Sequence, residues 1–398
     1  MGFNFRKYSG SILAIALVQL IFVMAAWAGP QKVYFAGFAF LSDYADIGHE
    51  YPYSKIISEI SYKSKNRSEI EAILSKKVKK ISNPNIEMIT DELGDHKSAN
   101  ALSLALTLDW EDVCTEKIAP NLYKIVLNLH GQILVFDFNS KEIVATYPFG
   151  VRVNDALETQ PDKVHIQNLF HRLYFGNIGD VNFLDEFINC LEKIKIKETY
   201  SHRLKVAEVV LGKKSFELMP EKVKTNQDGY KKFVAQQFSS FLSANHEVSV
   251  LPYTAGHAIQ GKMALRFENG TALNLSVPDA DIPIIITVRG FKKVKMDENH
   301  TGASWAYGSF IKLTVKDPWG DPVVDTKFKN AAVKIIPASQ TEVTIDSDWS
   351  AFEESLLSLF NQLTTQISER SSSWISKKTK DKSAKSQLKK LEALLREV

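Results

Sequence analysis

Apolar residues recur along the chain in two spacings, and each spacing predicts a different kind of element. Uninterrupted apolar runs of strand length cover 32–40 and 204–211, which is typical of strands buried on both faces. Elsewhere apolar residues return at every third or fourth position, as they do on the buried face of a helix. These helical patterns cover 70–81, 164–173, 184–191, 230–242 and 352–367. Helices and strands are therefore both expected.

Shorter apolar segments lie in two groups that predict antiparallel meanders. The first group covers 102–149, with turn residues at Gly131-Gln132 and at 139–141, and the second covers 248–336. Short strands separated by turn residues at this spacing are typical of meanders. Asn269-Gly270, within the second group, is a strong signal for a hairpin.

The two halves of the chain repeat one order of elements: buried strand, helix, meander and closing helix. A polar stretch without periodicity, near 195–203, separates them. We therefore predict an α+β fold of two domains, 29–197 and 198–370, each a strand meander packed against helices. Duplication of one module is a hypothesis, and two unrelated domains are the alternative because few residues are identical. The order resembles the α+β modules of bacterial periplasmic accessory proteins, a likeness of architecture that carries no function.

The first 28 residues have the features of a cleavable secretory signal peptide. Arg6 and Lys7 precede an apolar run from Ile12 to Trp27, and the sequence Ala26-Trp27-Ala28 supplies the small residues that favour cleavage. We predict cleavage after Ala28, a periplasmic or secreted protein, and no transmembrane span after cleavage. An uncleaved anchor is the alternative, although the run is shorter than the ~20 residues of a membrane-spanning helix.

Composition narrows the functional classes. The 398 residues include 49 Lys and Arg against 46 Asp and Glu, a net charge of +3. A nucleic-acid-binding protein carries a clear basic excess, so no nucleic-acid partner is expected. Two cysteines are too few for a four-thiolate zinc site. In an oxidising compartment Cys114 and Cys190 are candidates for one disulfide, although Cys190 also fits the buried side of a helix.

Positive charge gathers at the end of the chain, where residues 371–398 form a basic tail. One hypothesis is a solvated, poorly ordered tail. The other is contact with an anionic surface, such as lipid headgroups or an acidic partner. The lysines available for this contact are Lys377, Lys378, Lys380, Lys382, Lys385, Lys389 and Lys390.

Signals of catalysis are sparse. The sequence contains no nucleophile elbow, no phosphate-binding glycine loop and no zinc-protease motif, and no cofactor is expected. One loop after the first strand combines carboxylates with an imidazole, which suits a metal ion or acid–base chemistry. These residues are Asp43, Asp46, His49 and Glu50, and an ordinary solvent-exposed loop is the alternative.

Aromatic residues in the second meander are a candidate ligand or partner surface. Trp305, Tyr307 and Trp319 lie in or near segments that contain glycine. Such residues stack on sugars or fill a protein interface, and partly buried core positions are the alternative.

The favoured hypothesis is an exported, non-enzymatic binding or assembly protein of the bacterial periplasm or cell envelope, with a protein partner there. Two other functions stay open. A secreted hydrolase or metal-dependent enzyme would need Asp46 and His49 to meet a distant carboxylate or histidine in one pocket. A carbohydrate-binding module would use Trp305 and Trp319.

Overall fold

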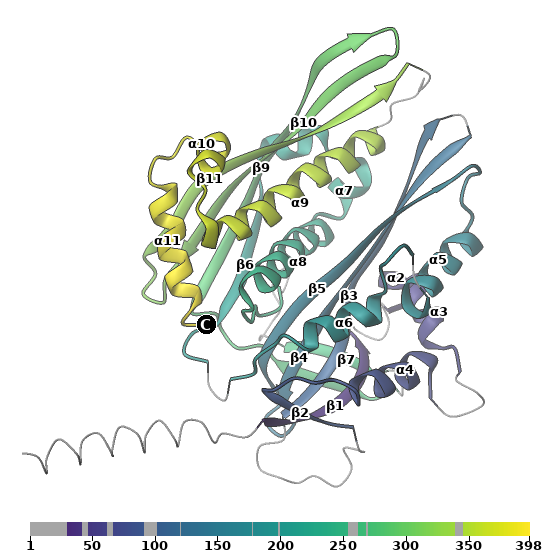
Figure 1. Cartoon of the computed structure of the whole chain (residues 1–398), viewed down its shortest axis with the longest axis vertical. Coiled ribbons are helices and arrows are strands. Elements are labelled where there is room, and N and C mark those ends of the chain that lie inside the picture. Colours follow the sequence, from purple (N-terminus) through teal and green to yellow (C-terminus); the bar gives the residue numbers. More distant parts are fainter. Residues whose placement is uncertain are drawn as a thin grey trace, which may run out of the picture.

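The computed structural model describes ten stretches of the chain. They are 30–41, 47–61, 67–90, 102–119, 121–176, 178–197, 200–253, 262–267, 270–338 and 345–398. Two β-sheets are stacked within them, with helices between and beside the sheets (Figure 1). The predicted α+β class is therefore confirmed.

Seven strands form the first sheet, in the order β2-β1-β3-β4-β5-β8-β7. They are β1 (Gln31–Phe40), β2 (Ile86–Ile89), β3 (Leu102–Ala119), β4 (Leu122–Asp137), β5 (Glu142–Leu157), β7 (Lys262–Phe267) and β8 (Ala272–Ser276). β1 runs parallel to β2 and β3, whereas β3, β4 and β5 form an antiparallel meander. Because β7 also pairs with β1, the sheet closes on itself.

Five of the described helices pack on one face of this sheet, and the first hydrophobic core lies between them and the sheet. They are α2 (Ile47–Glu50), α3 (Pro52–Ser58), α4 (Glu69–Val78), α5 (Lys163–Phe175) and α6 (Phe183–Leu191). Ser68 caps α4 by accepting a hydrogen bond from the backbone of Glu71, and Asp162 caps α5 by accepting one from His165. The apolar sides of these helices then pack on β1, β3, β4 and β5.

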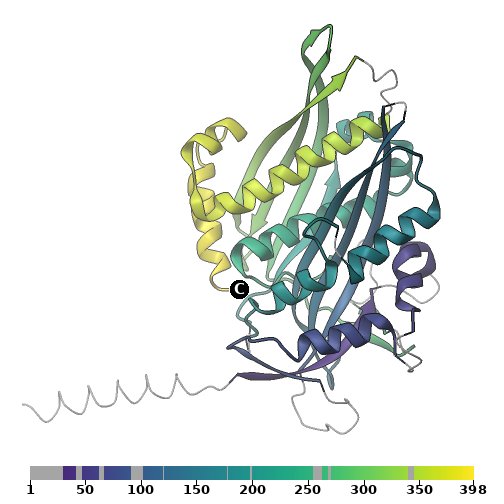
Figure 2. The ribbon, with the colours of Figure 1, turned by 45° about the vertical axis from the view of Figure 1, so that its right-hand side comes forward.

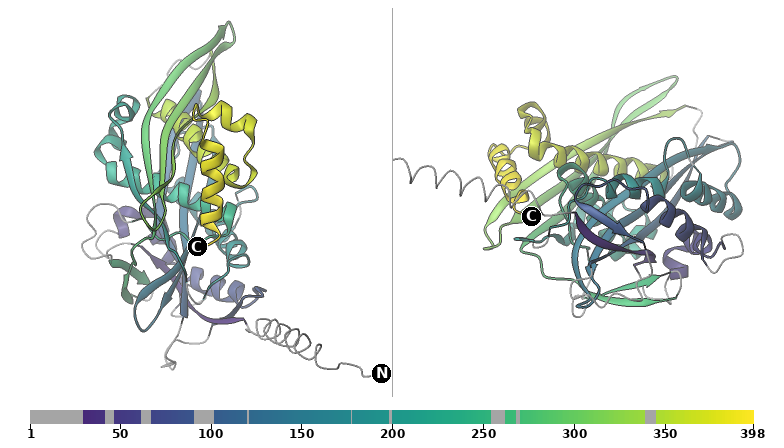
Figure 3. Two further views of the ribbon diagram at one scale, coloured as in Figure 1. Left: turned by 90° about the vertical axis from the view of Figure 1, so that its left-hand side faces the viewer. Right: turned by 60° about the horizontal axis from the view of Figure 1, so that its bottom comes forward.

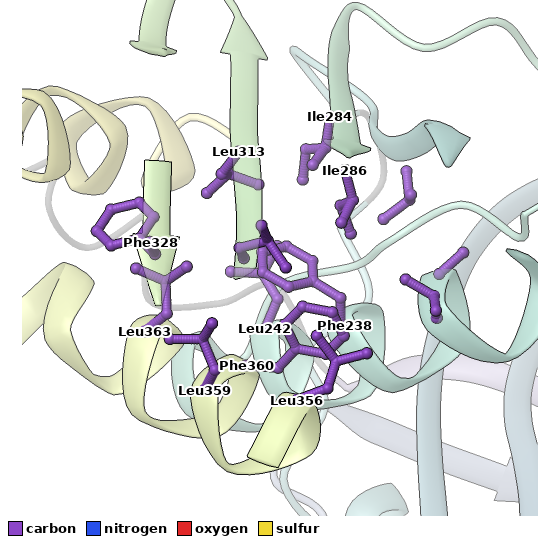
Figure 4. Packing of buried hydrophobic residues seen from close by; sticks show 14 of the residues in the cluster. Phe238, Leu242, Ile284, Ile286, Leu313, Phe328, Leu356, Leu359, Phe360 and Leu363 are labelled. Carbon is purple, nitrogen blue, oxygen red and sulfur yellow. The ribbon is translucent and has the colours of Figure 1, made fainter. Parts of the chain in front are cut away.

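The second sheet has four strands, in the order β11-β10-β9-β6. They are β6 (Leu204–Leu211), β9 (Ile282–Asn299), β10 (Gly302–Lys316) and β11 (Pro322–Pro337). A 3₁₀ helix, η2 (Lys213–Leu218), leads from β6 towards the helices α7 (Glu221–Thr225) and α8 (Gln227–His246). α8 and α9 (Ile345–Glu369) cover one face, where Phe238 and Phe360 pack edge to face with their ring centroids 5.4 Å apart (Figure 4).

The helices α8 and α9 lie between the two sheets (Figures 1 and 2). α8 contacts β5 of the first sheet and β6 of the second, while α9 contacts β10 and β11 and also reaches β3. The order of layers is therefore helices, first sheet, α8 with α9, and second sheet. Within the described stretches, the far face of β10 and β11 is left open, with α10 (Ser372–Lys378) at its border.

The two sheets share one topology in their central parts. β1 is parallel to β3, and β6 is parallel to β9; in each case an antiparallel meander of three strands follows. In each half a helix separates the first strand from the meander, and another follows the meander. The order of elements predicted for the two halves is thus present in space, and duplication remains a hypothesis about its origin.

One predicted turn is wrong: Gly131-Gln132 lies inside β4, which continues unbroken to Asp137. A Cβ atom at Gly131 would lie 2.8 Å from the ring of Phe149 and 2.9 Å from that of Phe183. Glycine at this position gives room to two aromatic side chains instead of turning the chain. The other predicted turn, near 139–141, is present.

The predicted hairpin joins a different sheet from the one expected. β7 and β8 pair antiparallel around Gly270, whose φ of 85° lies in the left-handed region that glycine favours. However, β8 pairs with β5 and β7 pairs with β1. The hairpin therefore completes the first sheet, although in the sequence it lies in the second predicted domain, 198–370.

The end of the chain is folded, so the hypothesis of a poorly ordered tail is wrong. α10 and α11 (Ala384–Leu395) pack on the second core through Ile375, Leu388 and Leu391. Arg370 also forms an ion pair with Glu392 on α11. The leucine spacing in α11 gives the helix one apolar side, and burial of that side fixes it. Among the described helices, none is both long and apolar enough to cross a membrane.

Candidate anion-binding groove

The open face of the second sheet exposes every second residue of β11. Side chains alternate between the two faces of a strand, and the positions from Asp325 to Pro337 that point outward are all exposed. Their neighbours Val324, Phe328 and Ile336 are buried. We call this open side of β9, β10 and β11 the outer face.

Two adjoining hollows on the outer face together form a groove. One has a volume of about 330 Å³ and the other about 700 Å³, and both are lined by Phe310, Lys329 and Lys378. β9, β10 and β11 supply the floor, while α10 and the residues after it supply one wall. The groove therefore brings together segments that lie far apart in the sequence.

Cations outnumber carboxylates in the lining of the groove. The carboxylates are Asp325 and Asp381. The cationic residues are Arg289, Lys292, Lys312, Lys327, Lys329, Lys377, Lys378 and Lys380. Such an excess on one side of a hollow produces a positive potential that attracts anions.

The two carboxylates are already engaged. Asp325 Oδ1 lies 2.7 Å from Lys312 Nζ and accepts a hydrogen bond from Thr314, and the Lys312 contact lowers the pKa of Asp325. Asp381 accepts hydrogen bonds from Thr326 and Ser383, which lower its pKa. The described residues place no carboxylate within 4 Å of the other groove cations, which are therefore available to a ligand.

The surroundings of Lys378 in the groove disfavour its charged form. Its Nζ donates a hydrogen bond to Asn330 Oδ1, an uncharged partner. Burial lowers the pKa of Lys378, and the charge of Lys377 lowers it further. An anion in the groove would offset both effects, because an opposite charge nearby favours the protonated amine.

The groove combines charged and apolar residues. Among the described residues that line it, none is histidine or cysteine. Apolar atoms of Phe310, Val294 and Ala331 contribute to its surface. Lysines around an apolar floor can bind a ligand that combines negative charge with an apolar part.

Two of the four residues proposed for a metal or acid–base site, Asp43 and Asp46, lie outside the described residues. His49 and Glu50 are exposed on α2. The described stretches contain no group of three side chains placed to hold a metal ion. The site stays a prediction.

The three aromatic residues do not share one surface: Trp305 and Tyr307 lie beside Lys293 near one end of β10, and Trp319 lies beyond the other end, so the aromatic surface stays a prediction. Tyr307 is fully buried, and its hydroxyl donates to Asp348 at 2.6 Å. Trp305 is partly buried, with Lys293 Nζ 4.5 Å from its ring centroid. Trp319 is 83% exposed in the turn after the opposite end of β10.

The candidate disulfide between Cys114 and Cys190 is not formed. Val113 packs in the same cluster as Cys190, so the next residue of β3, Cys114, points to the other face of the sheet. Burial raises the pKa of the Cys190 thiol to about 12, and Glu186 raises it further. This thiol is therefore unreactive at neutral pH.

The predicted basic tail contributes only part of its lysines to the groove. Lys377, Lys378 and Lys380 line it. The other four lysines of the tail are exposed and do not line it: Lys382, Lys385, Lys389 and Lys390.

Sequence analysis missed the groove cations that come from the strands. The segment from Asp325 to Lys329 places charged residues at alternate positions, which is the pattern of a strand with one exposed face. That pattern alone could have identified an open face.

A second group of titratable residues, also missed, is buried where the first sheet meets α8 and α9. Asp109 is 2% exposed and accepts a hydrogen bond from Gln132. Burial raises its pKa to about 6, although the charge of Lys232 opposes this. His130 is 4% exposed, contacts Gln237, and has a pKa lowered to about 4 by burial and by Arg152.

Comparison with known proteins places the chain in no family. No known family and no curated protein matches the sequence. A minor lipoprotein from Acinetobacter baumannii has a TM-score of 0.21 and 14% identity, over 42% of this chain and 94% of the other. An NTF2-like protein involved in plasmid conjugation has a TM-score of 0.12 and 9% identity, over 60% of this chain and 80% of the other. Likenesses this slight carry no argument about function.

Proposed function

We propose that this protein is an exported, non-enzymatic binding or assembly protein of the bacterial envelope, and that the groove on the outer face binds its anionic partner. The observation that carries the proposal is the excess of cations in the groove, most of them without a carboxylate partner. Export rests on the signal-like pattern of residues 1–28.

The placement of the cations supports a binding role. Isolated exposed lysines are common and carry no function. Here Lys292 on β9 and Lys327 and Lys329 on β11 lie on the same face of one sheet, on either side of β10. Like charges on one sheet face repel each other, which costs stability. A bound anion would offset that repulsion.

Binding of tripolyphosphate, a soluble polyanion, tests the proposal. Isothermal titration calorimetry of the wild-type protein should show binding that weakens steeply with added salt, since salt screens exposed charges. The triple variant Lys292→Gln, Lys327→Gln and Lys329→Gln should bind at least tenfold more weakly, or about 1.4 kcal/mol.

A second triple variant controls for net charge. Lys76→Gln, Lys79→Gln and Lys80→Gln removes the same charge from exposed positions at the end of α4. It should bind tripolyphosphate as the wild type does. Equal losses in the two variants would mean that net charge, and not the groove, attracts the anion.

A further inference from the structure

An apolar patch adjoins the groove on the outer face. Four large side chains are exposed on β9 and β11: Val294 at 41%, Met296 at 63%, Val333 at 66% and Ile335 at 72%. β9 and β10 project from the rest of the molecule at their shared turn (Figures 1 and 3). The four side chains lie towards that end of β9 and β11. Exposed apolar residues gathered in this way are typical of an interaction surface.

The strand register places this patch and the cations on one continuous surface. Ala306 on β10 pairs with both Val294 and Val333, so the three share a face. Two residues further along, Gly308 pairs with Lys292 and Ala331. The cations thus begin about 7 Å from the apolar row, at ~3.4 Å per residue along a strand.

The residue types favour a lipid surface over a folded protein. Cores of protein interfaces are depleted of lysine and enriched in arginine and aromatic residues. Here Arg289 is the single arginine among the eight cations that line the groove, and the patch is aliphatic. Lysines beside exposed aliphatic side chains suit an anionic bilayer, where lipid phosphates bind the amines and apolar side chains enter the headgroup boundary.

We propose that the outer face docks on a bilayer that carries anionic headgroups. The face lies flat on the membrane, because the end of β9 exposes Asp297 and Glu298 and would resist entry end first. Val294, Val333 and Ile335 enter the interface, while Lys292, Lys327 and Lys329 contact phosphates. This inference rests on the proposed function and names the partner of the same groove.

Vesicle flotation tests the docking. Wild-type protein should float with phosphatidylcholine vesicles that contain roughly one-third phosphatidylglycerol, and not with pure phosphatidylcholine, because the attraction needs anionic lipid. Equal flotation with both vesicles, or with neither, would overturn the inference.

A patch variant separates this inference from the proposed function. Met296→Gln, Val333→Thr and Ile335→Thr remove apolar surface at three exposed positions that do not line the groove. Partition onto anionic vesicles should fall about tenfold, as expected for lost apolar burial, while tripolyphosphate binding is unchanged. Unchanged partition would exclude docking through the patch, while the proposal that the groove binds an anion would stand. If the wild-type protein did not bind tripolyphosphate, the proposed function itself would be wrong.

Environment-sensitive labels provide a measurement that does not depend on the patch variant. In a protein with Cys114→Ser and Cys190→Ser, a nitrobenzoxadiazole label at Val333→Cys should shift to the blue with anionic vesicles. The control is Trp319→Cys, which is 83% exposed against 66% for Val333 and lies beyond the opposite end of β10. A shift at 319 and none at 333 would show that the turn after β10, and not the apolar patch, contacts the membrane, and it would overturn the inference.

Discussion

The two sheets have the same central topology but differ in what covers them. The first packs its own helices on one side and α8 and α9 on the other, whereas the second packs α8 and α9 on one side and leaves its outer face open. β4 is accordingly buried at nearly every position, and β11 is buried at alternate positions. Two sheets of one topology therefore offer different surfaces to a partner, and the open face of the second sheet is the candidate for binding.

Removing a side chain from the covered side of the second sheet should have the largest effect on stability. Phe360 on α9 is fully buried against Phe238 (Figure 4). Phe360→Ala should lower the free energy of unfolding by about 3–5 kcal/mol, because it leaves a cavity in a packed core. Urea denaturation measures this loss. Trp319→Ala, at an exposed turn, should change stability by less than about 0.5 kcal/mol.

Carboxylates on the covered and open faces should respond to pH with opposite signs. Burial raises the pKa of Asp109 to about 6, so its folded form holds a proton that the unfolded form releases near pH 4. Its contribution to stability therefore falls as pH rises from about 4 to 6. Asp109→Asn should gain up to ~3 kcal/mol on the wild type between pH 4 and 7, as measured by denaturation at each pH.

Asp325 on the outer face supplies the contrast to Asp109. Lys312 lowers its pKa, so its contribution is present above the unfolded pKa and is lost as pH falls. Asp325→Asn should therefore lose stability relative to the wild type as pH rises from 3 to 5, by a small amount since the pair is exposed. A change of the same sign in both variants would contradict the assignment of the two environments.

Enlarging a side chain on the covered first sheet and one on the outer face should give a smaller difference in stability. Gly131→Ala introduces a Cβ against Phe149 and Phe183, and it should cost about 1–3 kcal/mol because a packed region must shift. Ala331→Val on the outer face adds two methyl groups at an exposed position and should stay within about 0.5 kcal/mol. Thermal unfolding of both variants makes the comparison.

The smallest expected effect concerns charge on the outer face itself. Lys327→Gln with Lys329→Gln should raise the free energy of unfolding by a few tenths of a kcal/mol at low salt, since it relieves repulsion between neighbouring cations. High salt should abolish the gain because it screens exposed charges. A loss of stability would show that these lysines serve the fold and not a ligand.

Local patterns predicted most elements but not their partners. The spacing of apolar residues predicted β1, α5, α6, α8 and much of α9, because each has one buried side or two. Gly131 was misassigned, since a glycine that admits aromatic rings and one that turns the chain look alike in sequence. The hairpin of β7 and β8 was recognised, but its choice of sheet depends on open edges that only the assembled fold defines.

The candidate site was predicted only in part for a related reason. The lysines of the tail stand close together in the sequence and predict a basic cluster, whereas Lys327 and Lys329 alternate with buried residues and form no such cluster. Their meeting with Lys377 and Lys378 depends on where α10 packs. That position is set by tertiary contacts of Ile375 and Trp374, which a local pattern does not report.

The hairpin that closes the first sheet has a consequence for the order in which the molecule is made. β7 and β8 supply Leu265, Phe267 and Leu275 to the small cluster inside the closed sheet. A nascent chain that has reached only residue 197 lacks these side chains and leaves the edges of β1 and β5 exposed. The first half therefore finishes folding only after synthesis has passed residue 276, and a fragment ended at 197 should aggregate unless β7 and β8 are supplied separately.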